Sequence, residues 1–106
     1  MDNEKIKLRI ENLAFTWDDD KAESNLQKHS VSFKLGAEVF FDGKSLESVD
    51  VRFGENRYRL LGVTFSSLLL VVVFAERITL GGEEVLRIIS ARRATREERL
   101  DYEENI

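Results

Sequence analysis

The sequence predicts a small α+β domain made of two helices, then a four-stranded and mainly antiparallel sheet, then a closing helix. Apolar residues recur at helical spacing through residues 18–40, and from Ser45 onward the period changes to two. Thr95 and Glu98 have the spacing of a capping box, which opens a helix. A chain of 106 residues can bury one hydrophobic core, so a single domain is expected.

Two short helices are expected in the first half of the chain. Three aspartates at residues 18–20 supply capping carboxylates at a helix start, and Asp20 has capping-box spacing to Glu23. Ser32 is placed to cap the second helix. The residues expected on the inner faces are Ala22, Leu26 and His29, then Phe33, Ala37 and Phe40. The segment before the first helix also allows a short additional strand near Leu13–Trp17.

The second half of the chain predicts the sheet. The expected strands are Leu46–Phe53, Arg57–Phe65, Leu68–Glu76 and Val85–Ala91. Short turn segments separate them, and connections this short favour antiparallel pairing, because a parallel pair needs a crossover of a dozen residues or more. The continuous apolar run Leu68–Ala75 predicts a central strand.

Composition excludes several kinds of site. The chain has no cysteine, which excludes disulfides, thiolate catalysis and cysteine-ligated zinc. His29 is the only histidine, so a histidine-rich metal site and a two-histidine acid/base pair are excluded as well, and we expect neither metal nor cofactor. The eight-residue run Leu68–Ala75 is too short for a bilayer, which needs about twenty residues. With a charged first segment, the chain is expected to be cytoplasmic and without membrane contact.

Positive charge is concentrated in one part of an acidic chain. The net charge is −4, yet residues 87–99 hold five arginines against two glutamates. Residues 52–99 hold nine arginines and no lysine, and guanidinium groups suit bidentate contacts with phosphate. A local basic surface indicates one face that meets a phosphate-bearing or acidic partner. The alternative is that these arginines form ion pairs across the sheet.

Alternation along the strands predicts which arginines share a face. Arg57 and Arg59 lie on one face of their strand, and Arg87 shares a face of another strand with Ala91. That second strand ends in the arginine pair at residues 92–93. Which strands are neighbours does not follow from the sequence, so convergence of the arginines on one surface is a hypothesis.

Several motifs together resemble the BrnT family of toxins from two-gene toxin–antitoxin systems. They are Trp17-Asp18, Lys21, Asn25, Lys28-His29, Phe33, Phe40-x-Asp42, Glu55-x-Arg57, Gly62, the run Arg87–Arg92, and Tyr102. The resemblance covers about residues 14–102, and its most specific parts are the spacing from Trp17 to His29 and the run that begins at Arg87. It makes residues 14–106 a single toxin domain, preceded by an extension at residues 1–13. Many members have proline and glycine where this chain has Asp19 and Ser30.

The resemblance implies a RelE-like fold and metal-independent cleavage of RNA that inhibits translation and arrests growth. It also implies neutralisation by a cognate BrnA-like antitoxin of the ribbon-helix-helix class, through which alone the toxin would reach operator DNA. The expected reaction is attack by a ribose 2′-hydroxyl on the adjacent phosphate, which needs proton transfer and cations around the phosphorane.

The residues expected to act in this reaction are basic or aromatic. We assign catalysis to Lys28, His29, Arg59 and Arg92. We assign RNA binding to Trp17, Lys21, Arg57, Arg87 and Arg93.

Each assignment has a structural alternative. His29 can cap or pack its helix, Lys28 can be a solvated helix residue, and Trp17 can anchor the core. Arg87 can form an ion pair on the sheet, for instance with Glu76. For the whole protein, the alternative to a ribonuclease is a catalytically inactive binding module that docks the antitoxin and acts in operon repression.

Overall fold

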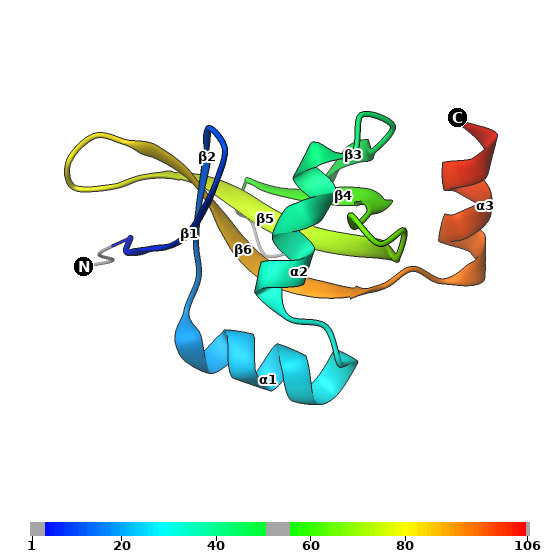
Figure 1. Ribbon diagram of the computed structural model, residues 1–106, viewed down its shortest axis with the longest axis horizontal. Helices are drawn as coiled ribbons and strands as arrows, with labels where there is room; N and C mark the ends of the chain where they lie inside the picture. Colours follow the sequence, from blue (N-terminus) through cyan, green and yellow to red (C-terminus); the bar gives the residue numbers. More distant parts are fainter. Residues whose placement is uncertain (1–3, 51–55, 106) are drawn as a thin grey trace.

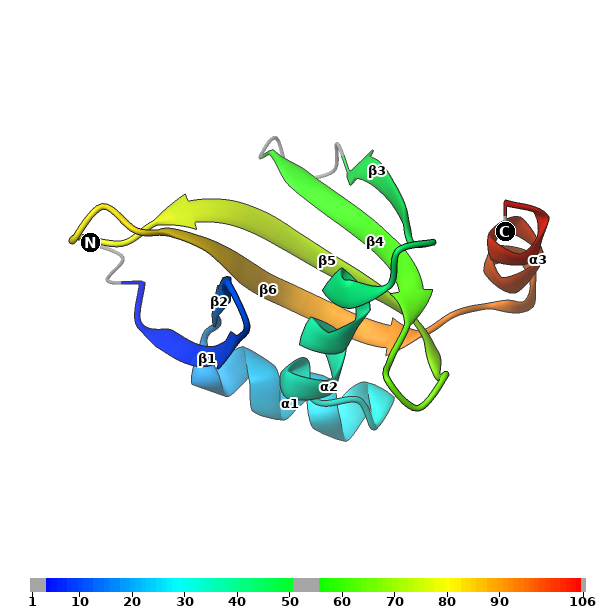
Figure 2. The same ribbon diagram turned by 45° about the horizontal axis from the view of Figure 1, so that its top comes forward.

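The computed structural model describes residues 4–50 and 56–105 and contains a six-stranded mixed sheet (Figure 1). In chain order the elements are β1 (Ile6–Ile10), β2 (Leu13–Thr16), α1 (Asp19–His29), α2 (Phe33–Ala37), the 3-10 helix η1 (Glu38–Phe41), β3 (Leu46–Asp50), β4 (Arg57–Val63), β5 (Leu69–Ile78), β6 (Glu84–Arg93) and α3 (Arg96–Glu104). The strand order across the sheet is β1-β2-β6-β5-β4-β3. In Figures 1 and 2, α2 crosses β5 and β6, α1 lies alongside β6, and α3 lies beyond one end of the sheet.

The antiparallel meander expected in the second half of the chain is confirmed. β3 pairs with β4, β4 with β5, and β5 with β6, in each case antiparallel. β5, which contains the apolar run, lies in the interior of the sheet. The strand expected at Leu46–Phe53 is described as far as Asp50, and the rest of it lies outside the described residues.

The sheet is larger than the predicted four strands, and that prediction is wrong. β1 and β2 form an antiparallel hairpin, and β2 then joins β6 in parallel. β2 confirms the additional strand expected near Leu13–Trp17. The signal missed at residues 6–10 is a short alternation of aliphatic and basic side chains, which is the pattern of a strand with one covered face.

α1 begins earlier than a capping box at Asp20 and Glu23 would place it. Its N-cap is Asp18, whose side chain accepts a hydrogen bond from the backbone N–H of Lys21 at 3.0 Å. The helix ends at His29, and Ser30 adopts φ 58° and ψ 28°, the left-handed region that favours glycine. This is the position at which the resemblance expects glycine, so Ser30 adopts the backbone conformation of such a turn.

The other two helix starts are confirmed. The Ser32 side chain accepts from the backbone N–H of Leu35 at the start of α2, and Thr95 and Glu98 form the capping box of α3. α2 is only five residues long and continues as η1. Gly36 allows α2 to approach the sheet closely, because a Cβ atom there would lie 3.2 Å from the Cβ of Ala91.

Apolar side chains are packed on both faces of the sheet. The larger cluster lies between the sheet and α1, α2 and η1, and its buried members include Phe15, Val31, Phe33, Ala37, Val39, Leu60, Leu70, Val72, Phe74, Ile88 and Ala91. The smaller cluster lies on the opposite face and joins α3 to the sheet through Leu61, Leu69, Val71 and Tyr102. We call this second, less covered side the open face. Within the described residues, no helix is long and apolar enough to cross a membrane.

Candidate functional site

A β-bulge in β6 decides which face each arginine occupies. The pairing of β5 with β6 shifts by one residue, which leaves Ile89 without an opposite residue. As a result Ile88 and Ala91, three residues apart, both belong to the cluster beneath the helices. Arg87 and Arg92 therefore fall together on the open face. The expected grouping of Arg87 with Ala91 is wrong, because the bulge inserts one residue between them.

Arg59 and Arg92 lie on the same face of the sheet, the open face. Arg92 lies in register with Val71, which is in register with Leu61 of β4, and Arg59 precedes Leu61 by two residues. Arg59 and Glu98 line the same hollow of about 240 Å³ between the sheet and α3. Its walls are Leu46, Glu47, Ser48, Arg59, Leu61, Val71, Glu98 and Asp101. Arg59 and Arg92 thus share one surface, whereas Arg93 faces the other side of the sheet, so the convergence expected from the sequence holds only in part.

Arg92 is held by a carboxylate of α3. Its guanidinium donates to both carboxylate oxygens of Glu98, at 2.8 and 2.9 Å. This bidentate contact, together with the hydrogen bond from the Thr95 backbone N–H, lowers the pKa of Glu98 to about 2 despite its partial burial. Arg92 therefore fixes the start of α3 as well as contributing charge to the open face.

Arg87 also carries a carboxylate partner, which is Glu4 rather than Glu76. Its Nη1 lies 3.0 and 3.1 Å from the two carboxylate oxygens of Glu4, and the Thr16 hydroxyl donates to the same carboxylate at 2.7 Å. The side chains of Arg87 and Glu4 are only 18% and 3% exposed. Arg87 thus forms an ion pair on the sheet, as the structural alternative expected, but its partner is Glu4 from the N-terminal segment. Arg57 begins β4 and lies opposite Asp50 of β3.

The end of α1 is fixed to β6 by a buried asparagine. The Asn25 side chain donates to the carbonyl oxygens of Val31 and Ala91, at 2.9 and 2.8 Å, and accepts from the Ala91 backbone N–H at 3.2 Å. Asn25 is 7% exposed, whereas Leu26, which was expected to face inward, is 48% exposed. The inner face of α1 is thus marked by a polar residue that hydrophobic periodicity does not detect.

Lys28 and His29 form the last turn of α1, beyond Asn25. Lys28 is exposed and His29 is half-buried. α1 and β6 run in the same direction (Figures 1 and 2), so the chain after Asn25 and the chain after Ala91 head toward the same end of the molecule. Arg93 lies in register with Leu70 of the helix-side cluster and is exposed on that side. Arg92 and Arg93, adjacent in sequence, thus face opposite sides of the sheet.

Trp17 and Lys21 lie at the other end of α1. Trp17 packs edge-on against Phe33, with ring centroids 5.9 Å apart, and is half-buried. It borders a hollow of about 360 Å³ with Ala22 and Leu26, among others. Lys21 is exposed in the first turn. The structure therefore separates these two residues from Lys28 and His29 by the length of the helix.

A hydrogen-bonded pair that the sequence did not reveal anchors α3. The Tyr102 hydroxyl donates to Asp42 at 2.6 Å, and Asp42 also accepts from the backbone N–H groups of Val63 and Lys44. Burial and the Asp42 carboxylate raise the pKa of Tyr102 to about 12. Burial opposes ionisation of Asp42, but its hydrogen bonds lower its pKa overall. Asp42 and Tyr102 both belong to the motif set, yet sequence spacing gives no sign that they meet.

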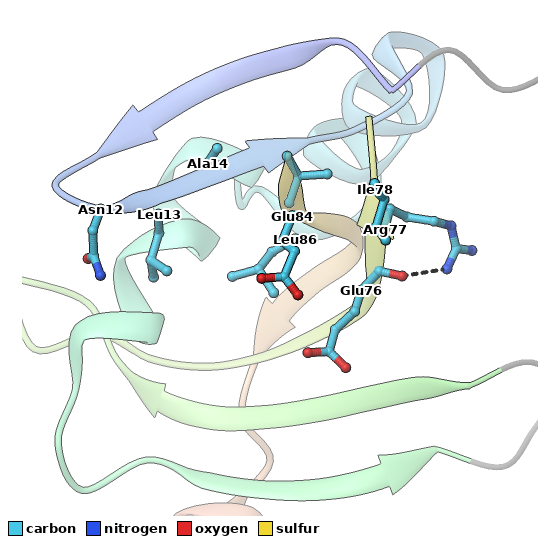
Figure 3. A pocket seen from close by; sticks show the side chains of 9 residues that line it. Asn12, Leu13, Ala14, Glu76, Arg77, Ile78, Glu84 and Leu86 are labelled. Atoms are coloured by element: carbon cyan, nitrogen blue, oxygen red, sulfur yellow. Dashed lines mark hydrogen bonds between the residues drawn. The ribbon is translucent and has the colours of Figure 1, made fainter. Parts of the chain in front are cut away.

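A further hollow of about 350 Å³ lies between the β1–β2 and β5–β6 hairpins (Figure 3). Figure 3 shows the carboxylates of Glu76 and Glu84 beside Leu86, with Leu13 across the hollow. Two carboxylates make this an unfavourable place for RNA phosphates. In residues 4–50 and 56–105, no three histidine, aspartate or glutamate side chains are grouped so that they could hold a metal ion.

Similarity to known proteins identifies the family. Residues 17–98 match the family described as the ribonuclease toxin BrnT of type II toxin–antitoxin systems. The chain belongs to the BrnT family. Its fold is similar to the crystal structure of the Brucella abortus ribonuclease toxin BrnT, with 27% sequence identity and a TM-score of 0.55, over 76% of this chain and 94% of that chain. No curated protein is significantly similar to the chain.

The match to the BrnT family begins at Trp17, so β1 and β2 precede it. Glu4, which pairs with Arg87, is thus contributed from outside the matched residues. Lys28, His29, Arg59 and Arg92 all lie within them. As a type II system, the BrnT family pairs its toxin with an antitoxin.

Proposed function

We propose that this chain is a metal-independent endoribonuclease that cleaves cellular RNA in the cytoplasm and so inhibits translation. The observation that supports this most directly is the arrangement at the end of β6. There the last turn of α1, with Lys28 and His29, is fixed beside a strand that ends in Arg92 and Arg93. The family is named a ribonuclease toxin, which agrees with this chemistry.

The proposed reaction transfers phosphate within one strand of RNA. The ribose 2′-oxygen loses its proton to a base and forms a bond to the adjacent phosphorus, and the bond from phosphorus to the 5′-oxygen breaks. The leaving 5′-oxygen takes up a proton, so the products are a 2′,3′-cyclic phosphate and a 5′-hydroxyl. Negative charge accumulates on the phosphorane, where guanidinium groups stabilise it.

The roles follow from side-chain chemistry and position. We assign proton transfer to the Lys28–His29 turn, because a histidine is the side chain best suited to gain and lose protons near neutral pH. We assign charge stabilisation to Arg59 and Arg92, which lie on the same face of the sheet. Arg57 binds a phosphate on the same face as Arg59, and Arg93 binds one on the side of the helices. Lys21 and Trp17 contact RNA further along α1. Arg87 acts on bound RNA only at a distance, through the electric field of its ion pair with Glu4, because its side chain is largely buried.

Purified protein incubated with RNA in the presence of EDTA tests the activity. We expect fragments that carry 2′,3′-cyclic phosphate ends, and we expect His29→Ala and Arg59→Ala to slow cleavage about 100-fold while they remain folded. Lys44→Ala serves as the control, because Lys44 is exposed and belongs to no part of the proposed site. Intact RNA with folded wild-type protein would contradict the proposal.

We further propose that a BrnA-like antitoxin of the ribbon-helix-helix class neutralises the toxin by covering the open face. The hollow beside Arg59 has an apolar floor that fits apolar side chains of a partner, and Arg59 offers one contact for an acidic side chain, although Glu47, Glu98 and Asp101 also line the hollow. A standard interface buries about 1,600 Å² in total, half of it on each partner. The chain exposes 6845 Å², so a partner centred on Arg59 would leave little room for RNA there.

Hydrogen exchange on the complex tests this placement. Binding of the antitoxin should protect residues 57–61 of β4 more strongly than the exposed start of α1. Equal accessibility of β4 with and without antitoxin would mean that neutralisation acts elsewhere. Operator DNA should bind the complex and not the toxin alone.

An inactive binding module is the second candidate function, and one observation favours it. Arg87 and Arg92 already have carboxylate partners, which reduces the positive charge available to RNA. In that case the chain would bind its antitoxin and support operon repression without cutting RNA. Normal growth during verified expression of folded protein would decide for this function.

A further inference from the structure

Asn25 occupies a special place beside the sheet. β2 pairs with β6 only at Phe15–Leu86 and Thr16–Arg87. Further along β6, α1 lies where a neighbouring strand would continue (Figure 1). The backbone N–H and carbonyl of Ala91 both bond to the Asn25 side chain. One side-chain amide thus replaces the peptide group of a missing strand.

The chemistry of this contact requires an amide of this length. Ala91 presents one donor and one acceptor on the same edge, and a carboxamide offers the complementary pair. The second N–H of the same amide group bonds to the Val31 carbonyl, just after the left-handed Ser30. An aspartate could not donate either bond, and an alanine would leave buried backbone groups without partners.

These three bonds link two parts of the proposed site. On one side they fix the Ser30–Val31 turn that directly follows Lys28 and His29. On the other side they fix β6 at the residue before Arg92. Lys28 and His29 have no such bond of their own to β6 among the hydrogen bonds found in the described residues, so Asn25 is the polar link between the two groups.

We infer that Asn25 is a positioning residue, which sets the Lys28–His29 turn against the arginine end of β6. The inference rests on the proposed function, because it gives Asn25 a role through His29 rather than through contact with RNA. A misplacement of about 1 Å can lower a reaction rate about 100-fold, so such a residue has a large effect at a distance.

A double-mutant cycle separates positioning from mere stability. Asn25→Ala should lower the cleavage rate about 100-fold at a temperature where it remains folded. Added to His29→Ala, the same substitution should lower the rate less than about threefold further, because the group that it positions is already gone. If Asn25→Ala lowers the rate as much on the His29→Ala background as in the wild type, the inference is overturned. Full activity of Asn25→Ala would overturn it as well.

Two control variants accompany the cycle. Val72→Ala removes volume from the core, and its effect on the rate should be the same on the wild-type and His29→Ala backgrounds. Gln27→Ala removes an exposed amide from the same helix and should change nothing. If Asn25→Ala does not fold, Asn25→Gln takes its place, since it keeps the amide group and changes only the length of the side chain.

Amide exchange keeps the inference testable apart from catalysis. Asn25→Ala should speed exchange at residues 28–31 and 91–93 and leave α3 as in the wild type. Failure of the wild type to cleave RNA would overturn the proposed function alone. Unchanged exchange at residues 28–31 would overturn positioning by Asn25, whether or not the wild type cleaves RNA.

Discussion

Arg92 and Arg93 are neighbours in the chain, yet the sheet gives them different surroundings. Arg92 lies on the open face in a bidentate contact with Glu98, and Arg93 is exposed on the side of the helices. Clustering of arginines in the sequence predicts a functional region, and this stays a prediction. It could not assign each arginine to a face, because that depends on a bulge of one residue.

Substitution of the two arginines should therefore have unequal effects on stability. Arg92→Ala leaves the partly buried Glu98 without its partner and should lower the free energy of unfolding by about 1 kcal/mol. Arg93→Ala should change it by less than about 0.5 kcal/mol, because the side chain is exposed. Urea unfolding followed by circular dichroism measures both. Equal losses in the two variants would contradict this account of Arg92.

Acid should weaken the attachment of α3 in a defined range. The folded-state pKa of Glu98 is about 2, below the ordinary value of 4.5, so its ionised form is favoured by folding. The stabilisation is complete above about pH 4.5 and is lost as the pH falls toward 2. Glu98→Gln should flatten this part of the stability profile relative to the wild type. Melting curves between pH 2 and 6 test the prediction, and an unchanged profile would count against it.

At the scale of elements, strong local signals were sufficient for most of the fold. The caps at Ser32 and Thr95 and the apolar run in β5 gave correct helix starts and a correct interior strand. α1 was found, but its buried face was misjudged, because Asn25 is polar and hydrophobic periodicity favours Leu26. β1 was missed because its five residues carry a weak alternation.

The turn after α1 offers a test of local backbone strain. Ser30 has φ 58°, which costs a residue with a Cβ atom about 1 kcal/mol relative to glycine. Ser30→Gly should raise the free energy of unfolding by up to about 1 kcal/mol and leave the Asn25 bonds in place. Thermal melts measure the gain. Ser66→Gly is the matched control, since Ser66 is exposed in a turn and does not have positive φ.

At the scale of the whole molecule, strand neighbours were beyond the reach of the sequence. Periodicity gives each strand its two faces, but pairing between distant strands depends on tertiary contacts. The parallel contact of β2 with β6 joins segments about seventy residues apart, and no local signal announces it. For the same reason the sequence could suggest Glu76 as a partner of Arg87, whereas the observed partner is Glu4.

The N-terminal segment should contribute to stability through that ion pair. Glu4→Ala removes the partner of a largely buried guanidinium and of the Thr16 hydroxyl, and should lower the free energy of unfolding by about 3 kcal/mol. Lys7→Ala removes only a surface pair with Asp19 and should cost less than about 1 kcal/mol. Urea midpoints compare the two variants. Equal midpoints would show that the segment is attached by its strand pairing alone.

The bulge at Ile89 means that the pairing of β6, and not only its residues, determines which of its side chains share a face. If all of these residues paired without the bulge, strict alternation would place Arg87 and Arg92, which are five residues apart, on opposite faces. A deletion of Ile89 would leave the two arginines four residues apart, so a regular strand without a bulge would still carry both on the open face. A relative of the same length whose β6 pairs without the bulge would instead divide these arginines between the two sides of the sheet, although it keeps every motif residue.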